Sequence, residues 1–405
     1  MVLSMRDLVV IGGGPAGASC ARTAALGGLE VLLIEKDVHP REKLCGGALT
    51  HRVVDLVDFD IEPATEVQFS GGRLHSRKGT SIDFTIDQQF SGYLVNRPKF
   101  DKYLIEKAID VGVEVVQDTK AVTVEQTRSG IRVLTVGDSY KAQLLVGADG
   151  VNGFVAKQVG LRDGWKPNKV GLCISADIPV DSKEIIRSMA LSASGDALGV
   201  DVHFGLLRWG YGWCFPKKDE LSVGIGTRLD LAANLKDHWK SFVKSVEEAK
   251  GLKFDLSRQS AFRVPLGVPK TPLVARRTML IGDAAGLVSP LSGEGIFYAM
   301  ESGIIAAKVA CEAAEKKKPS HVMEYGRIVK ENILNELAAA EYLANILYKS
   351  IENIDIMLQI ASEDSVMLRH LIDVLAGVRS FVDIRKDMMK RMLMKYPLKA
   401  LKLRF

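Results

Sequence analysis

The 405-residue sequence has few cysteines, and none of them stands in a recognisable pair. Five single cysteines are spread along the chain without any CxxC spacing, at positions 20, 45, 173, 214 and 311. Scattered thiols of this kind argue against structural disulfides and against a structural zinc site. We therefore expect a protein of a reducing compartment, cytoplasmic and without a bound metal.

Long apolar runs are also missing. No stretch of about 18 apolar residues occurs, so we expect no membrane-spanning helix. The first apolar run begins almost at once, which predicts that there is no signal peptide. The formal net charge of +5 is mild, and we expect no nucleic-acid partner. The length allows two or three domains or one large interleaved unit.

The stretch from residue 7 to residue 35 carries the strongest local pattern. An apolar β-branched run at 7–11 is typical of a buried parallel strand. Gly12, Gly14 and Gly17 follow with GxGxxG spacing, which permits a tight turn, a close approach to a pyrophosphate and tight packing of the next helix. Glu35 then ends a second strand, 18 residues after Gly17, where a ribose-binding carboxylate is expected. The combination predicts a nucleotide-binding unit.

A polar loop follows and contains Cys45, Gly46 and Gly47. Adjacent glycines favour backbone freedom over regular structure. One interpretation is a flexible turn with an incidental cysteine; the other is a loop that approaches a flat ligand and places the thiol at a reaction centre. Arg97 and Asp101 open a helix that we expect to end near residue 111. They are either helix-end charges or a pair whose arginine holds a phosphate or a cofactor edge.

Two further apolar strands end in an aspartate, at Asp149 and at Asp283. The first returns the chain to the opening sheet, so the nucleotide domain is discontinuous. Gly293 and Gly295 then precede a long small-residue helix at 296–314, whose N-terminus presents N–H donors and a positive dipole end. Between these motifs the pattern predicts an antiparallel sheet, with strands at 170–178, 190–194, 200–204, 212–215 and 221–226.

An aromatic run within that sheet contains Tyr211, Trp213 and Phe215. Such a run forms either core or, because glycines lie beside the rings, a wall against a ligand. Alternation places Cys214 on the opposite face. From residue 325 onward the sequence predicts only helices. Its end, 385–405, has eight Lys or Arg and one acid among apolar residues, which indicates either a membrane surface or anionic partner, or a solvated helix packed on the body.

These motifs, in this order, resemble the FAD-dependent oxidoreductases of the aromatic-hydroxylase fold group. The resemblance implies an α/β fold with a discontinuous Rossmann-like FAD-binding domain, an antiparallel-sheet substrate domain and a helical C-terminal region. The corresponding boundaries are 1–60, 94–165 and 270–315 for the first, 61–93 and 166–269 for the second, and 316–405 for the third. The cofactor-binding residues that it implies are Gly12, Gly14, Ala16, Gly17, Glu35, Cys45, Gly46, Gly47, Arg97, Asp149, Asp283, Gly286, Gly295 and Ile296.

Within that group the chain is most similar to the geranylgeranyl reductases, which saturate isoprenoid double bonds of archaeal membrane lipids and chlorophyll side chains. The match rests on the Cys45–Gly46–Gly47 loop, the aromatic run and the glycines around residue 294. It implies that Cys45, Gly293 and Gly295 serve catalysis, and that Tyr211, Trp213 and Phe215 line a prenyl channel. Val151, which follows Asp149–Gly150, begins a segment without the Ser and Arg of many hydroxylases.

The expected reaction is hydride transfer from reduced FAD to an alkene carbon, with a proton to the other carbon. NAD(P)H or reduced ferredoxin would supply the electrons, and a prenylated lipid with a phosphate-bearing head would be the substrate. Two alternatives stay open: a monooxygenase acting on a lipid or aromatic compound, and a non-catalytic flavin redox module. A halogenase is disfavoured, because Trp209 and Trp213 lie four residues apart rather than two.

Overall fold

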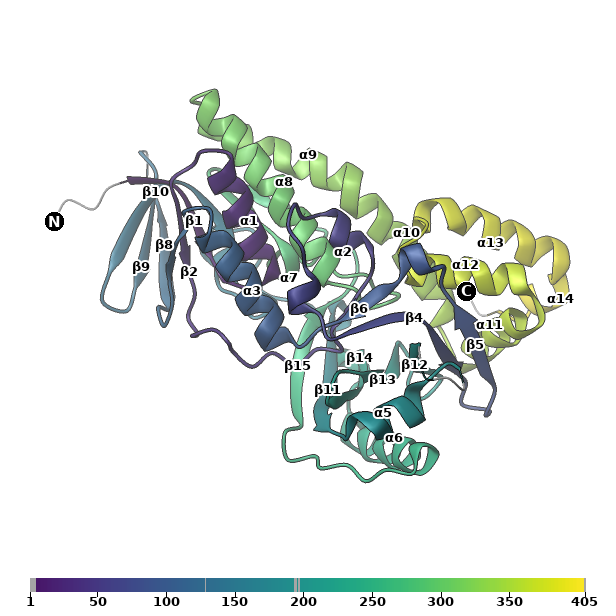
Figure 1. Ribbon diagram of the computed structural model, residues 1–405. Coiled ribbons are helices and arrows are strands. Elements are labelled where there is room, and N and C mark those ends of the chain that lie inside the picture. The colour runs from purple at the N-terminus through teal and green to yellow at the C-terminus, as the bar shows by residue number, and fades with distance from the viewer. Residues whose placement is uncertain (1–4, 128, 193–194, 196, 404–405) are drawn as a thin grey trace.

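A computed structural model describes residues 5–403 except 128, 193–194 and 196. Two large sheets form its body, and a group of helices closes it at the C-terminal end (Figure 1). The first sheet carries the N-terminal motif, the second carries the aromatic run, and the C-terminal helices lie beside the second sheet. The fold class expected from the sequence is therefore confirmed.

The first sheet is built around the apolar strands of the opening motif. Among the described residues it has eight strands, and the order of its central part is β16-β17-β10-β1-β2-β7. The strands β1, β2, β7, β10 and β17 pair in parallel, as buried β-branched runs favour. Their bounds are Met5–Ile11, Val31–Ile34, Glu114–Val116, Ser139–Gly147 and Thr278–Leu280, with β8 (Ala121–Gln126), β9 (Ile131–Thr135) and β16 (Val274–Ala275) added antiparallel.

Three helices pack near this sheet. They are α1 (Pro15–Leu26), α3 (Arg97–Ile109) and α8 (Ile296–Glu315). The first and the last approach backbone to backbone, because a Cβ at Gly303 would lie 2.4 Å from the Ala16 carbonyl oxygen. The small residues of both helices thus bring the glycine turn and the start of α8 to one place.

The second sheet has nine strands among the described residues, in the order β15-β11-β14-β13-β12-β4-β6-β3, with β5 beside β4. All of its pairings are antiparallel except that of β12 with β4. The sheet is therefore antiparallel as expected, apart from this one pairing. The strands are β3 (Ala48–Leu49), β4 (Val67–His75), β5 (Ser81–Thr85), β6 (Gly92–Leu94), β11 (Val170–Pro179), β12 (Leu198–Phe204), β13 (Gly210–Pro216), β14 (Glu220–Arg228) and β15 (Ser260–Pro265).

The two faces of the second sheet differ. One face packs against α5 (Ser182–Met189) and α6 (Leu235–Lys250), and Cys214 is fully buried there, as alternation predicts. The strand expected at 190–194 is not formed by its described part, because Ala190 makes only an isolated bridge to Leu198. Residues 193–194 lie outside the described residues. The other face of the sheet carries the aromatic run.

The C-terminal region is helical from residue 324 onward, as predicted. Its helices are α9 (Glu324–Val329), α10 (Asn335–Leu347), α11 (Ile351–Glu363), α12 (Ser365–Leu375), α13 (Phe381–Lys395) and α14 (Pro397–Ala400), with a π-helical turn at Lys330–Leu334. None of the described helices is both long and apolar enough to cross a lipid bilayer. A small apolar cavity of about 60 Å³ lies inside this bundle.

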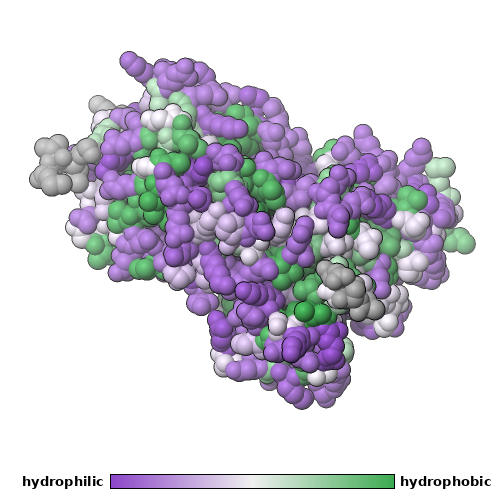
Figure 2. Space-filling model, in the orientation of Figure 1, coloured by the Kyte–Doolittle hydropathy of each residue, from purple (hydrophilic) through white to green (hydrophobic). Residues whose placement is uncertain are grey.

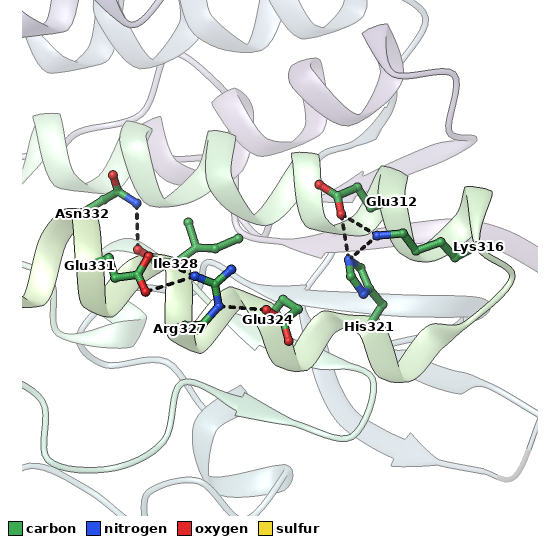
Figure 3. A network of polar contacts seen from close by, with 8 residues as sticks. All are labelled: Glu312, Lys316, His321, Glu324, Arg327, Ile328, Glu331 and Asn332. Carbon is green, nitrogen blue, oxygen red and sulfur yellow. Dashed lines mark hydrogen bonds and ion pairs between the residues drawn. The ribbon is translucent and has the colours of Figure 1, made fainter.

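Exposed ion pairs reinforce the connection from α8 to α9 (Figure 3). Glu312 near the end of α8 accepts hydrogen bonds from Lys316, at 2.9 Å, and from His321 of the following turn, at 2.8 Å. Arg327 of α9 forms ion pairs with Glu324 on its own helix and with Glu331 in the π-helical turn that follows. Such solvent-exposed pairs contribute little individually, so the helices are held mainly by the apolar core between them.

Candidate active site

The glycine turn between β1 and α1 has its predicted geometry. Gly12 has φ +109°, and a Cβ there would lie 2.3 Å from the Ala148 carbonyl oxygen. A Cβ at Gly17 would lie 1.8 Å from the Gly12 oxygen, so both glycines are required by the fold itself. At Gly14 the nearest atom to an added Cβ is Nη2 of Arg41, at 3.5 Å. The first and third glycines therefore pack the turn, whereas Gly14 borders open space.

Glu35 lies beside that turn at the end of β2. The carboxylate accepts a 2.6 Å hydrogen bond from the Gly13 N–H and a 3.0 Å bond from the Asp37 N–H. The residue is buried. The acid predicted from its spacing thus lies at the glycine turn, where a ribose hydroxyl could compete for the same oxygen atoms.

Two arginines converge on one buried acid near the turn. Arg97, at the first position of α3, binds Asp101 through two hydrogen bonds of 2.7 and 2.9 Å. Arg41 binds the same carboxylate at 3.1 Å. Burial opposes the charge of Arg97, but Asp101 outweighs it and raises the pKa of the guanidinium, with a smaller contribution from the nearby Cys45. This cluster therefore connects the glycine turn with the Cys45 loop.

Asp149 serves the local backbone. One carboxylate oxygen accepts hydrogen bonds of 2.6 and 2.8 Å from the N–H groups of Phe154 and Val155. The other oxygen is buried and has no partner among the described residues. Burial raises the pKa of Asp149. An unpartnered buried oxygen is costly, and a ligand group donating to it would remove that cost.

Asp283 follows β17 in the short helix α7 (Gly282–Ala285). Burial raises the pKa of its carboxyl, and the charges of Lys43 and Arg97 oppose that rise. A Cβ at Gly295 would lie 3.7 Å from the Asp283 Oδ1 atom, and one at Gly286 would lie 2.8 Å from the Trp165 ring. Asp283, which follows β17, therefore lies beside the start of α8, with Lys43 nearby.

A cavity of about 270 Å³ opens between the second sheet, the Cys45 loop, the start of α8 and the C-terminal helices. Of the described residues that line it, Glu294 alone is charged. Most others are aliphatic, aromatic or glycine, which is the usual character of a small-molecule pocket. The predicted residues on its wall are Cys45, Gly46, Gly47, Tyr211, Trp213, Phe215, Gly293, Gly295 and Ile296.

The Cys45 loop and the aromatic strand touch each other at this cavity. A Cβ at Gly46 would lie 3.0 Å from the Phe215 ring and 3.4 Å from the Trp213 Nε1 atom. That Nε1 atom is buried and has no hydrogen-bond partner among the described residues. Tyr211 donates a 2.5 Å hydrogen bond to the Ser292 carbonyl. The aromatic run is therefore a cavity wall rather than interior core.

The start of α8 is anchored beside the cavity. Gly293 has φ +73°, and a Cβ there would lie 2.8 Å from the Tyr211 hydroxyl. Glu294 accepts hydrogen bonds from the Thr50 hydroxyl, at 2.7 Å, and from Arg52, at 2.5 Å. These contacts fix the glycines relative to the Cys45 loop.

Several residues at the site had no distinctive sequence signal. Arg41 and Lys43 sit in the polar loop before Cys45, and nothing in their spacing separates them from ordinary surface charge. Cys173 lines the cavity from β11, and burial raises the pKa of its thiol to about 12. Tyr348 lines it from the helical region and donates a 2.8 Å hydrogen bond to the Leu291 carbonyl.

The residues present fit a dinucleotide with a flat redox-active end. The open space at Gly14 with Arg41 beside it suits a pyrophosphate, and the unpartnered Asp149 oxygen accepts a hydrogen bond. The glycine-lined gap between Cys45 and Gly295 suits a planar ring system. FAD has both features, and these residues would hold it.

A second cluster of ionisable residues lies on the opposite face of the sheet. His75, Asp201 and His203 bring their side-chain ligand atoms within 4.8 Å of one another. The carboxylate, however, already binds Lys250 and lies 3.4 Å from Arg73. Burial opposes ionisation of Asp201, but the nearby His75, whose Nε2 lies 3.8 Å from the carboxylate, and the charge of Lys250 lower its pKa to about 2.

Comparison with known proteins identifies the family. Residues 5–191 match the FAD binding domain family. The chain is 30% identical to digeranylgeranylglycerophospholipid reductase of Methanocaldococcus jannaschii, over 86% of this chain and 92% of the relative. It is 32% identical to geranylgeranyl diphosphate reductase of Rhodobacter capsulatus, over 78% and 77%.

A crystal structure of a geranylgeranyl bacteriochlorophyll reductase-like protein from Thermoplasma acidophilum has the same fold. Its TM-score is 0.83 at 24% identity, and the match covers 98% of both chains. The FAD domain, the cavity and the two close sequence matches lead to one conclusion: this chain belongs to the geranylgeranyl reductase family.

Proposed function

We propose that this protein is an FAD-dependent reductase that saturates isoprenoid double bonds of prenylated lipid precursors. The observation that carries the proposal is the cavity of about 270 Å³, which is almost wholly apolar and meets the FAD-binding motifs at Cys45 and Gly295. An apolar chain can lie there with its surface removed from water, which stabilises binding by about 25 cal/mol per Å².

An isolated alkene has no carbonyl that a protein could polarise. When bound, reduced FAD supplies the hydride. The chain's own residues then have to hold the alkene in contact range, keep water out and provide a proton. Alignment of this kind can lower a barrier by about 7–11 kcal/mol, and the walls formed by Tyr211, Trp213 and Phe215 are suited to it.

We assign catalytic positions to Cys45, Gly293 and Gly295. Cys45 lies on the cavity wall in the loop beside the Arg97 guanidinium. The backbone N–H groups around Gly293 and Gly295 lie at the N-terminus of the long helix α8, where negative charge is favoured. Both glycines would therefore stabilise negative charge on a bound, reduced cofactor.

The remaining cofactor contacts follow from the first-sheet motifs. Gly12, Gly14, Ala16 and Gly17 would hold the pyrophosphate and Glu35 the adenosine ribose, with Arg97, Asp149, Asp283, Gly286 and Ile296 along the rest of the cofactor. NAD(P)H or reduced ferredoxin would reduce it. Steady-state assays with each donor in turn decide between them. The physiological donor is the one with which the rate of lipid reduction rises to a maximum as the donor concentration is increased.

We further propose that the C-terminal end touches an anionic membrane surface, where its lipid substrate resides. The helices α13 and α14 and the residue after them expose Leu393, Met394, Leu398 and Leu401, each at least 61% accessible. Exposed lysines at 386, 390, 395 and 402 lie among them, and green patches mark this end at the right margin of Figure 2. Apolar side chains with interspersed lysines suit an interface with anionic lipids.

Replacing Leu393, Met394, Leu398 and Leu401 by Ser tests the membrane contact. We expect binding to phosphatidylglycerol vesicles to fall while flavin content and turnover of detergent-dispersed substrate stay unchanged. The matched control is Val136→Ser, because Val136 is an exposed apolar residue in the turn between β9 and β10. Vesicle binding that is unaffected by the fourfold change would refute this contact.

The proposed reaction itself is tested under anaerobic conditions. Protein reduced chemically to the hydroquinone is mixed with a geranylgeranyl lipid, and the return of oxidised-flavin absorbance is followed. We expect reoxidation that requires the lipid and no oxygen. Reoxidation that depends on oxygen would indicate a monooxygenase, and no response to lipid at all would indicate an electron-transfer module; either result would refute the proposal.

A further inference from the structure

Trp209 has an unusual backbone conformation at the edge of the cavity. Its φ is +52°, which is uncommon for a bulky residue and persists only where surrounding contacts enforce it. The Arg228 N–H donates a 3.3 Å hydrogen bond to the Trp209 carbonyl, and the indole ring lies 5.8 Å from the Tyr348 ring. The ring lines the cavity. These contacts thus fix the indole ring of Trp209 directly before the first residue of β13.

Positive charge gathers around this ring. The Arg228 guanidinium lies over it, 4.7 Å from the ring centroid. Arg208 is exposed next to it in sequence and lies 3.5 Å from the carbonyl oxygen of Lys349, which is also exposed. Asp230 binds Arg228. Arg228 chiefly lowers the pKa of Asp230, and Arg208 adds to that effect. The two arginines therefore lie beside the ring, and exposed Lys349 belongs to the segment that Arg208 contacts.

The cavity interior cannot hold a phosphate. Its described walls carry no cation, and its one charged group, Glu294, is an acid. Placing an unpaired anion in such surroundings is strongly unfavourable. An anionic head attached to a chain in this cavity therefore has to lie at an edge where cations are available.

Among the described residues, two edges of the cavity have a cation beside a lining ring. At one, Lys43 lies 5.5 Å from the Phe262 ring centroid. Lys43 also lies two residues before Cys45, in the loop that borders the cofactor motifs. The other edge is Trp209 with its arginines. From there β13 runs inward, and its cavity-facing residues Tyr211 to Phe215 span about 13 Å towards the Cys45 loop.

We propose that Arg208, Arg228 and Lys349, grouped around Trp209, bind the phosphate-bearing head of the prenyl substrate. The chain then runs along β13, past Tyr211 and Trp213, to the reaction centre at Cys45. Trp209 then lies between the solvent-exposed, cationic surface and the apolar interior of the cavity. This inference rests on the proposed function, because it concerns the substrate of that same cavity.

The test compares two substrates with the same chain, geranylgeranyl diphosphate and geranylgeraniol, which differ only in the charged head. The variants are Arg208→Gln, Lys349→Gln and their combination; both side chains are exposed, so folding should be retained and is checked by thermal melting. We expect the KM for the diphosphate to rise about 5- to 20-fold in each single variant. The KM for the alcohol and kcat for both substrates should stay within twofold.

Arg132→Gln is the matched control, because Arg132 is a surface arginine with an acidic partner, Glu125, on a distant hairpin. Added salt should raise the KM of the unmodified protein for the diphosphate and should do so less in the double variant. An unchanged diphosphate KM, or an equal rise for both substrates, would overturn the head-group site.

Calorimetric titration with the same two ligands separates this inference from the proposed function. If the unmodified protein reduces neither substrate, the proposed function is refuted. The head-group site is then judged on affinity alone: it holds if the double variant loses affinity for the diphosphate selectively, and it is refuted if the affinity does not change.

Discussion

The substitution Gly14→Ala distinguishes what folding requires at this position from what FAD binding requires there. Gly14 has φ −76° and ψ −177°, which any residue can adopt. The nearest atom to an added Cβ is 3.5 Å away, an ordinary contact distance. Nothing in the described protein therefore requires glycine at this position, in contrast to Gly12 and Gly17.

The expected change in stability is small because two effects oppose each other. Alanine reduces the entropy of the unfolded chain, which stabilises by about 0.4–1 kcal/mol. Gly14 is also the N-cap of α1, where alanine is worse than glycine by about 0.5–1 kcal/mol. The free energy of unfolding of the apoprotein should therefore change by less than about 0.5 kcal/mol.

FAD binding should change much more. If the pyrophosphate lies against Gly14, an inserted methyl group costs about 1–3 kcal/mol, which is a rise of about 5- to 150-fold in Kd. Quenching of flavin fluorescence during titration of the apoprotein measures this Kd. The matched control is Gly164→Ala, an exposed glycine with no atom within 4 Å of an added Cβ. A normal FAD affinity in Gly14→Ala would refute the placement of the pyrophosphate.

Three further predictions concern the cavity, acid stability and the C-terminal helices. Cys45→Ala should bind FAD normally but lower lipid turnover about tenfold or more; an unchanged rate would remove Cys45 from the reaction. Burial lowers the pKa of His203 to about 3, below its unfolded value of about 6.5, so its contribution to stability is complete above pH 6.5 and is lost as the pH falls. His203→Phe should flatten the loss of stability between pH 6.5 and 4 in urea titrations, and an unchanged slope would contradict this. Asp364→Asn should lower the melting temperature and hydrogen-exchange protection of α13, because Arg391 and Lys395 both bind this carboxylate; protection equal to that of the unmodified protein would show that these pairs do not hold the helix.

The first sheet and its glycine turn could be predicted from the sequence because their determinants are local. The spacing of Gly12, Gly14 and Gly17, and the apolar run before them, fix a strand, a turn and a helix within one short segment. Glu35 could be placed because the distance from the turn to the end of the next strand is set by one helix. The same local reasoning assigned Cys214 to the face opposite the aromatic rings.

The pairing of the second sheet could not be predicted in the same way. β12 lies parallel to β4, more than a hundred residues earlier in the chain, and no local pattern encodes such a contact. Arg41 gave no signal either, because its role depends on Asp101 in a later helix. The positive φ of Trp209 likewise results from contacts with β14 and the C-terminal helices. A site whose residues come from distant segments can be recognised only from the three-dimensional structure.

Mass spectrometry of the product tests the central claim most directly. Chemically reduced protein is incubated without oxygen with a geranylgeranyl lipid. The lipid is then recovered, and its molecular mass is measured. The account predicts products heavier by two hydrogen atoms for each double bond reduced, with the head group unchanged. A product that gains an oxygen atom, or lipid recovered unaltered under conditions where the flavin is fully reduced, would contradict it.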